Sequence, residues 1–82
     1  MKIIKVRPCD RFKGCWNSFE IPGVEPTFDN PNSKQKAIDY ARGRFGGSSG
    51  EVHVYDATGK MIEQTIVIDG RGKYQQAKSA QE

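Results

Sequence analysis

The sequence predicts an α+β fold: a single antiparallel sheet of about five strands in the order β-β-β-α-β-β, with one helix packed on one face. Two observations lead to this fold. Short segments of alternating apolar and polar residues lie on both sides of a single segment with helical periodicity. Gly, Pro, Asn and Asp residues separate these segments, as turns require. With 82 residues and 35% apolar composition, the chain is expected to form one small domain with a thin core.

Three short strands are expected before the helix. Residues 2–7 alternate and are rich in β-formers, and residues 15–21 contain Trp and Phe. Residues 22–23 (Pro-Gly) end the second strand and are typical of a type II turn. Residues 24–28 form the third strand, and Pro26 within it cannot donate a ladder hydrogen bond, which predicts an edge position. The first strand is the other candidate edge.

Residues 32–45 are predicted to form the helix. Asn32 and Gln35 have the spacing of a capping box, and Ser33 is an alternative N-cap. Two glycines at 46–47 close the helix. The residues expected to share one buried stripe are Ala37, Ile38, Ala41 and Phe45.

A hairpin is predicted after the helix. Residues 51–55 and 61–68 alternate, and residues 56–59 (Asp-Ala-Thr-Gly) fit a type I turn with Gly in the left-handed position. The last strand is expected to place on one face the residues Ile62, Ile66 and Ile68. The domain is predicted to span 1–69, and 70–82 to form a flexible polar and basic tail.

Charge and hydropathy narrow the class of protein. Thirteen Lys and Arg against ten Asp and Glu give a net charge of +3, which is mild. Apolar runs are too short for a membrane span, so no membrane partner is expected. The first residues do not form a signal peptide, which predicts a cytoplasmic protein.

Two cysteines bracket a five-residue loop. Cys9 and Cys15 could form a disulfide in an oxidising compartment, but without a signal peptide we expect free structural thiols. A zinc site needs four ligands, whereas these cysteines and His53 supply three without zinc-site spacing. We therefore predict no metal and no cofactor.

Several of these segments match a known pattern. The pattern consists of a Trp in the second strand (Trp16), a Phe-Asp pair before the helix (Phe28-Asp29), Lys-x-x-Ala-Ile-x-x-Ala-Arg in the helix (Lys34 to Arg42), and an Asp-x-x-Gly-Lys hairpin (Val52 to Glu63). Within residues 1–68 the chain resembles a small stand-alone bacterial domain family of unknown function. The resemblance implies no enzymatic activity, because none is assigned to that family. Ser18 departs from the pattern, which has an apolar residue there.

Catalytic motifs are not expected. His53 is the single histidine, and neither a nucleophile nor an orienting group lies at a spacing that would activate it. The glycines at 43–50 follow the helix, so they do not form a phosphate loop before a helix N-terminus. The sequence therefore predicts a protein that is not an enzyme.

Protein binding is the leading functional hypothesis. One helix covers one face of a sheet, so the other face, or an edge strand, is free to bind a protein partner or a second copy. The expected anchors are Trp16, Tyr55, His53 and Phe12. Small size without catalytic residues suits a regulator or inhibitor, such as those that phages direct at bacterial proteins.

The alternative hypothesis is nucleic-acid binding. Lys36, Tyr40 and Arg44 recur every four residues on the helix face opposite the core stripe, a pattern that suits phosphate contact and base stacking. Further basic residues that would extend this surface are Arg42, Arg71 and Lys73. The competing interpretation is a solvated helix face on which Tyr40 stacks under Arg44.

Overall fold

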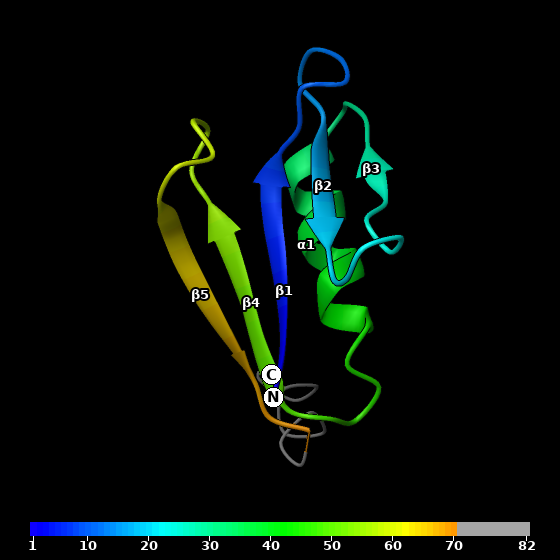
Figure 1. The fold of residues 1–82 in the computed structure, drawn as a ribbon, viewed down its shortest axis with the longest axis vertical. Coiled ribbons are helices and arrows are strands. Elements are labelled where there is room, and N and C mark those ends of the chain that lie inside the picture. Colours follow the sequence, from blue (N-terminus) through cyan, green and yellow to red (C-terminus); the bar gives the residue numbers. More distant parts are fainter. Residues whose placement is uncertain (71–82) are drawn as a thin grey trace.

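The chain folds as one sheet with one helix on one of its faces (Figure 1). The computed structural model describes residues 1–70. Their elements follow the predicted β-β-β-α-β-β order: β1 (Lys2–Pro8), β2 (Trp16–Phe19), β3 (Thr27–Phe28), α1 (Ser33–Gly43), β4 (Gly50–Tyr55) and β5 (Ile62–Ile68). The sheet order is β3-β2-β1-β4-β5. The α+β class is confirmed, and the predicted tail at 70–82 lies, apart from Gly70, outside the described residues.

The prediction of a wholly antiparallel sheet is wrong at one pair of strands. β1 and β4 are parallel, whereas β1–β2, β2–β3 and β4–β5 are antiparallel. The reason is the helix: β3 runs in the same direction as β1, and α1 carries the chain back before β4 begins. β1 is consequently the central strand, and its expected edge position is wrong. β3 lies at one edge, as Pro26 predicted, and β5 lies at the other.

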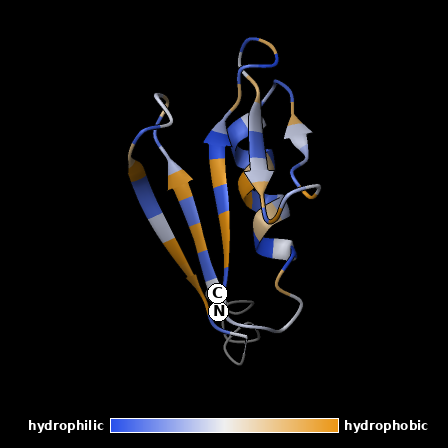
Figure 2. Ribbon diagram, viewed as in Figure 1, coloured by the Kyte–Doolittle hydropathy of each residue, from blue (hydrophilic) through white to orange (hydrophobic). Residues whose placement is uncertain are grey.

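The core lies between α1 and the sheet. Apolar and polar residues alternate along β1 and β4 (Figure 2), and the apolar set faces the helix. The core residues are Ile4, Val6, Ala37, Ile38, Ala41, Phe45, Val52, Val54 and Ile68, with Trp16, Phe28 and Ile66 packed at its margin. Each buried Ile or Val contributes about 1.5–3 kcal/mol relative to an exposed position. All four residues of the predicted helix stripe are buried, three of them in α1 and Phe45 in the turn that follows it.

Local details of the helix differ from the predictions. The capping box is not formed: Asn32 makes no side-chain cap hydrogen bond, and Gln35 Nε2 instead donates to Asp39 Oδ1 at 2.9 Å. The helix ends at Gly43, two residues before the predicted end. Phe45 still reaches the core from the following turn, where it is 4% exposed.

The two predicted turns, at residues 22–23 and 56–59, are present. Val24 N donates to Ile21 O at 2.8 Å, and Gly23 has φ 91°, as a type II turn requires. Gly59 N donates to Asp56 O at 2.9 Å, which closes the hairpin between β4 and β5. These turns are local, so the sequence could predict them.

A β-bulge separates the apolar residues of β5. The β4–β5 register shifts between Val54 and Tyr55, so that Val54 pairs with Gln64 and Tyr55 pairs with Ile62. Ile62 remains 46% exposed, whereas Ile68 is 9% exposed. The expectation that Ile62 shares the core face with Ile66 and Ile68 is therefore wrong.

Ser18 ties β2 to the helix. Its side chain is completely buried, and Oγ donates to Ala37 O at 2.6 Å. A larger apolar side chain would enlarge the space between β2 and α1, whereas serine satisfies its own hydroxyl on the helix backbone. This contact explains how a polar residue is accommodated at a completely buried position of β2.

Ser18→Ala is expected to lower the free energy of unfolding by about 1 kcal/mol, because it removes a buried hydrogen bond. Urea denaturation followed by circular dichroism measures the change. The control is Ser49→Ala at an exposed hydrogen-bonded serine, which should change stability by less than about 0.5 kcal/mol. Equal stability of Ser18→Ala and wild type would mean that the bond does not hold β2 against α1.

The expectation of free thiols is wrong, because Cys9 and Cys15 form a disulfide with a Cα–Cα distance of 5.4 Å. The end of β1 and the start of β2 lie next to each other in the hairpin, and Cys9 N donates to Cys15 O at 3.0 Å. The loop that the disulfide closes also contacts the helix start, where Ser33 Oγ donates to Gly14 O at 2.5 Å. The disulfide therefore fixes the hairpin loop beside the N-terminus of α1.

Reduction of the disulfide is expected to lower the free energy of unfolding by about 2 kcal/mol, since it releases a short closed loop in the unfolded chain. Urea denaturation with and without a reducing agent measures this difference. The double variant Cys9→Ser with Cys15→Ser should be destabilised to a similar extent and should not respond to the reducing agent. A wild-type protein that is indifferent to reduction would contradict a stabilising disulfide.

Candidate functional site

The sheet has a second face, here called the outer face, which the helix does not cover. The side chains of Ile4, Val6, Val52 and Val54 are buried towards the helix, so their neighbours in sequence point to the opposite side. No helix or strand of residues 1–70 packs over this side, which faces the viewer in Figure 1. Alternation and strand pairing place on it Ile3, Lys5, Arg7, Asn17, Phe19, Glu51, His53, Tyr55, Ile62, Thr65 and Val67.

Apolar side chains lie on the outer face of β5 and its neighbours. Ile3, Glu51 and Val67 form one row across β1, β4 and β5. In this row Ile3 is 38% exposed and Val67 is 66% exposed. Tyr55 pairs with Ile62 in a second row near the other end of the strands. The face thus presents aliphatic and aromatic groups to solvent at both ends of β5.

The middle of the outer face is polar and basic. Lys5 lies between Phe19 on β2 and His53 on β4. The Arg7 guanidinium lies over the Phe19 ring, 4.9 Å from its centroid. His53 Nε2 and Glu51 Oε1 are 2.7 Å apart, so the one carboxylate here is already hydrogen-bonded. The two cations and the aromatic rings are the groups that remain to contact a partner.

Asn17 occupies the end of the outer face near the disulfide. Its Oδ1 is buried and has no hydrogen-bond partner within the described part of the chain. It borders two open hollows of about 350 and 440 Å³, both also lined by Cys9 and Asp10. Asn17 could not be predicted as a site residue, since an asparagine in a strand gives no signal of its environment.

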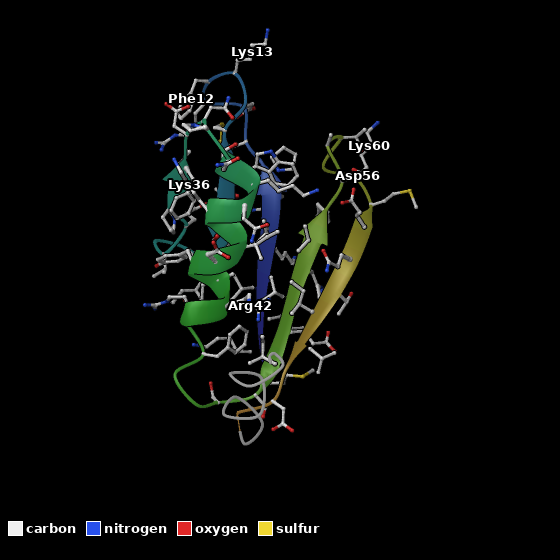
Figure 3. All side chains as sticks on the ribbon, turned by 180° about the vertical axis from the view of Figure 1, so that it is seen from behind. Phe12, Lys13, Lys36, Arg42, Asp56 and Lys60 are labelled. Carbon is white, nitrogen blue, oxygen red and sulfur yellow. A yellow bond between two sulfur atoms is a disulfide. The ribbon has the colours of Figure 1, made fainter. Side chains whose placement is uncertain are left out.

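Two of the four predicted protein-binding residues lie on the outer face. Tyr55 and His53 are there and are half-buried. Phe12 is 44% exposed in the disulfide-closed loop, which extends past the ends of β1 and β2 (Figure 3). It does not fold over the outer face to form a second core.

The placement of Trp16 on the uncovered face is wrong. Trp16 pairs with Pro8 and Phe28 and packs against the core on the helix side. Lys34 Nζ lies over its ring at 5.1 Å from the centroid and bonds Glu63 at 2.8 Å. The direction of a strand side chain changes with a register shift of one residue, which the sequence did not specify. Trp16 is therefore a packing residue.

The helix face proposed for nucleic acid is largely occupied by contacts within the protein. Lys36 Nζ donates to Asp29 O at 3.1 Å, and the Tyr40 ring packs on Phe28 with centroids 5.6 Å apart. Arg44 lies over Tyr40 at 5.8 Å, as the interpretation of a solvated face expected. Arg42 lies beside the hollow formed by Gly46 and Gly47. Arg71 and Lys73 lie outside the described residues.

Glu20 neutralises part of this helix face. Its carboxylate bonds Arg44 Nε at 2.8 Å and Lys2 Nζ at 3.2 Å, and Lys2 Nζ also donates to Arg44 O at 3.1 Å. The hydrogen bond from Arg44 is the main cause that lowers the pKa of the Glu20 carboxyl, against a smaller desolvation effect. This cluster could not be predicted from the sequence, because its members come from three distant parts of the chain.

The Glu20 cluster predicts a dependence of stability on pH. The pKa of Glu20 is lower in the folded protein than in the unfolded chain. The cluster therefore stabilises the fold above the unfolded pKa of about 4.3. This stabilisation is lost as the pH falls through the folded pKa. Glu20→Gln should therefore be less stable than wild type at pH 7, and the difference should disappear in strong acid.

Urea denaturation across an acid pH series checks this dependence. The matched control is Glu25→Gln, an exposed glutamate in the connection between β2 and β3, which should follow the wild-type curve. A constant difference between Glu20→Gln and wild type at every pH would show that the carboxylate charge is not what stabilises the cluster.

The charges of the described residues are nearly balanced. Residues 1–70 contain ten Lys and Arg and nine Asp and Glu, so most of the excess positive charge belongs to residues 71–82. Salt bridges within residues 1–70 engage Lys2, Lys34 and Arg44. Residues 1–70 therefore attract polyanions such as nucleic acids only weakly.

The residues with reactive or metal-binding side chains do not come together. Cys9 and Cys15 are joined to each other, so neither is a thiolate that His53 could activate. Among residues 1–70 there is no group of three His, Cys, Asp or Glu side chains that could hold a metal ion. No helix in this part of the chain is long and apolar enough to cross a membrane.

Comparison with protein-family models, curated proteins and solved structures gave no match to this chain. The resemblance to a bacterial family of unknown function stays a prediction, and function is argued from the geometry described above.

Proposed function

We propose that this protein is a non-enzymatic interaction module that binds another protein through the outer face of its sheet. The observation that carries the proposal is the exposure of Ile3 and Val67 at one end of the outer face and of Ile62 beside Tyr55 at the other, on a face that residues 1–70 leave uncovered. Exposed aliphatic groups beside an aromatic ring with a polar hydroxyl are typical of the centre of a protein interface.

The arrangement of charge on the outer face indicates the chemistry of the partner. Lys5 lies between the two apolar rows and Arg7 lies level with the row of Tyr55, whereas Glu51 is hydrogen-bonded to His53. A complementary surface would therefore combine apolar side chains with one or two carboxylates facing Lys5 and Arg7. Tyr55 and His53 remain the expected anchors from the sequence, and Ile3 and Val67 are added to them.

A regulator or inhibitor is the role that we infer for such a module. The domain is small and has its binding groups on rigid strands, which lowers the entropic cost of binding. The disulfide favours an oxidising compartment over the cytoplasmic location that the sequence predicted. Binding would occur without a cofactor.

Nucleic-acid binding by the helix face is less well supported as an alternative. Lys36 and Arg44 are engaged by Asp29 and Glu20, and Tyr40 would have to leave Phe28 to stack on a base. The loss of these contacts would offset part of the binding energy.

Tyr55→Ala and Ile3→Asp are each expected to weaken binding by roughly thirtyfold, equivalent to about 2 kcal/mol, because they remove an anchor or place a charge in an apolar row. The partner is first captured from a cell extract on the immobilised wild-type protein, identified and purified. Isothermal titration calorimetry with the purified partner then compares the variants at low and high salt.

Lys36→Ala and Arg44→Ala on the helix face are the matched controls, and mixed-sequence DNA and RNA are titrated in the same way. Protein binding that tolerates salt and survives both control variants supports the outer face. Tight nucleic-acid binding that falls steeply with salt and is lost in the control variants would overturn the proposal in favour of the helix face. Trp16→Ala is not informative here, because it would disturb the core.

A further inference from the structure

The outer edge of β5 is a free strand edge seven residues long. One side of β5 pairs with β4 from Gly50–Ile68 to Tyr55–Ile62, and no strand of residues 1–70 pairs with its other side. The helix packs on β1, β2, β3 and β4, so it leaves β5 at the margin of the sheet. Residues 62–65 and Val67 are exposed. Such an edge presents unpaired backbone N–H and C=O groups to another strand.

β5 lacks most of the features that prevent pairing of strand edges, and the two that it has, a bulge and a charge, both lie at Glu63. Its sequence, Ile-Glu-Gln-Thr-Ile-Val-Ile, contains neither Pro nor Lys, and its single charge is Glu63 at the bulge. The opposite edge is different: β3 has only two residues and follows Pro26. A strand that pairs along its length can therefore be added at β5 and not at β3.

We propose that the edge of β5 binds β5 of a second copy of this chain, antiparallel and with the two-fold axis at Thr65. Thr65 is the middle residue of β5, so this register pairs all seven residues of the strand: Thr65 with Thr65, Gln64 with Ile66, Glu63 with Val67, and Ile62 with Ile68. A Thr–Thr pair directly opposite each other is favourable in a sheet. The assembly joins two five-stranded sheets into one of ten strands.

The charges in and beside β5 are compatible with this register and disfavour the register about Ile66. Lys60 lies in the turn before β5 (Figure 3), and Asp69 follows its other end. In this register Met61 lies opposite Asp69 and Lys60 lies opposite Gly70, so no like charges face each other across the seam. A shift of the two-fold axis to Ile66 would instead place Glu63 opposite Asp69, which is destabilising because both are carboxylates.

This pairing limits the assembly to two copies. The same strand is used on both sides, so the contact is isologous, and the remaining edges of the assembly are two copies of β3. The short β3 strand offers little ladder for a third copy, so we expect a dimer and not a filament. This contact uses the backbone edge of β5, and it is separate from the outer-face surface around Tyr55.

Charge exchange at the two-fold axis tests the proposal. Sedimentation equilibrium of the full chain should show a concentration-dependent dimer. Thr65→Lys and Thr65→Glu should each raise the dimer dissociation constant by about tenfold or more, because like charges then lie directly opposite each other. An equimolar mixture of the two variants should form a heterodimer at least as tight as the wild-type dimer. Thr27→Lys at the β3 edge is the control and should leave the dimer intact.

Several results would overturn the proposal. They are a wild-type protein that stays monomeric up to millimolar concentration, a dimer that both Thr65 variants leave unchanged, and a Lys–Glu mixture that fails to associate. If a variant does not fold, amide hydrogen exchange of wild-type β5 decides: protection of its amides must rise with protein concentration. Ile3→Asp and Tyr55→Ala should keep the dimer, so failure of outer-face binding and failure of the dimer are distinguishable.

Discussion

The packing of α1 against the central strand β1 is the contact on which the rest of the structure depends. Ile4 and Val6 are fully buried beneath the helix, and the parallel pairing of β1 with β4 adds Val52 and Val54 to the same layer. The helix runs roughly along the strands (Figure 1), so its diameter of about 10–12 Å, set against a strand spacing of about 4.8 Å, limits how many strands it covers. One helix of this width leaves β5 at the margin, and because it lies on a single face, no helix or strand of residues 1–70 covers the outer face.

Polar contacts fix how the helix lies on the sheet. The Ser18 hydroxyl bonds the helix backbone from β2, and Glu20 binds Lys2 and Arg44, which come from the first strand and the helix end. The disulfide holds the hairpin loop beside the start of the helix, where Gly14 accepts a hydrogen bond from Ser33. Because of these contacts, charged and polar side chains on the helix side already have partners within the protein. The groups available for binding are therefore concentrated on the outer face and on β5.

The two proposals describe complementary surfaces of one sheet. The outer face has side chains for a partner of different chemistry, with Tyr55 and the aliphatic groups of Ile3 and Val67 around the cations of β1. The edge of β5 has backbone groups for a second copy. A dimer through β5 would place two outer faces side by side, and a partner that engages both would bind with the gain of bivalency.

The sequence by itself determined the elements that depend on neighbours in the chain. Alternation identified the strands, the spacing of Ala37, Ile38 and Ala41 identified the buried helix face, Pro26 identified the edge strand, and Asp56 and Gly59 identified a turn. Only the tertiary structure decided contacts between distant segments: the parallel β1–β4 pair, the disulfide, the Glu20 cluster and the side of the sheet on which Trp16 lies. The physical reason is that strand order and register are set by packing of the whole sheet against the helix, and a shift of one residue reverses the face of every side chain.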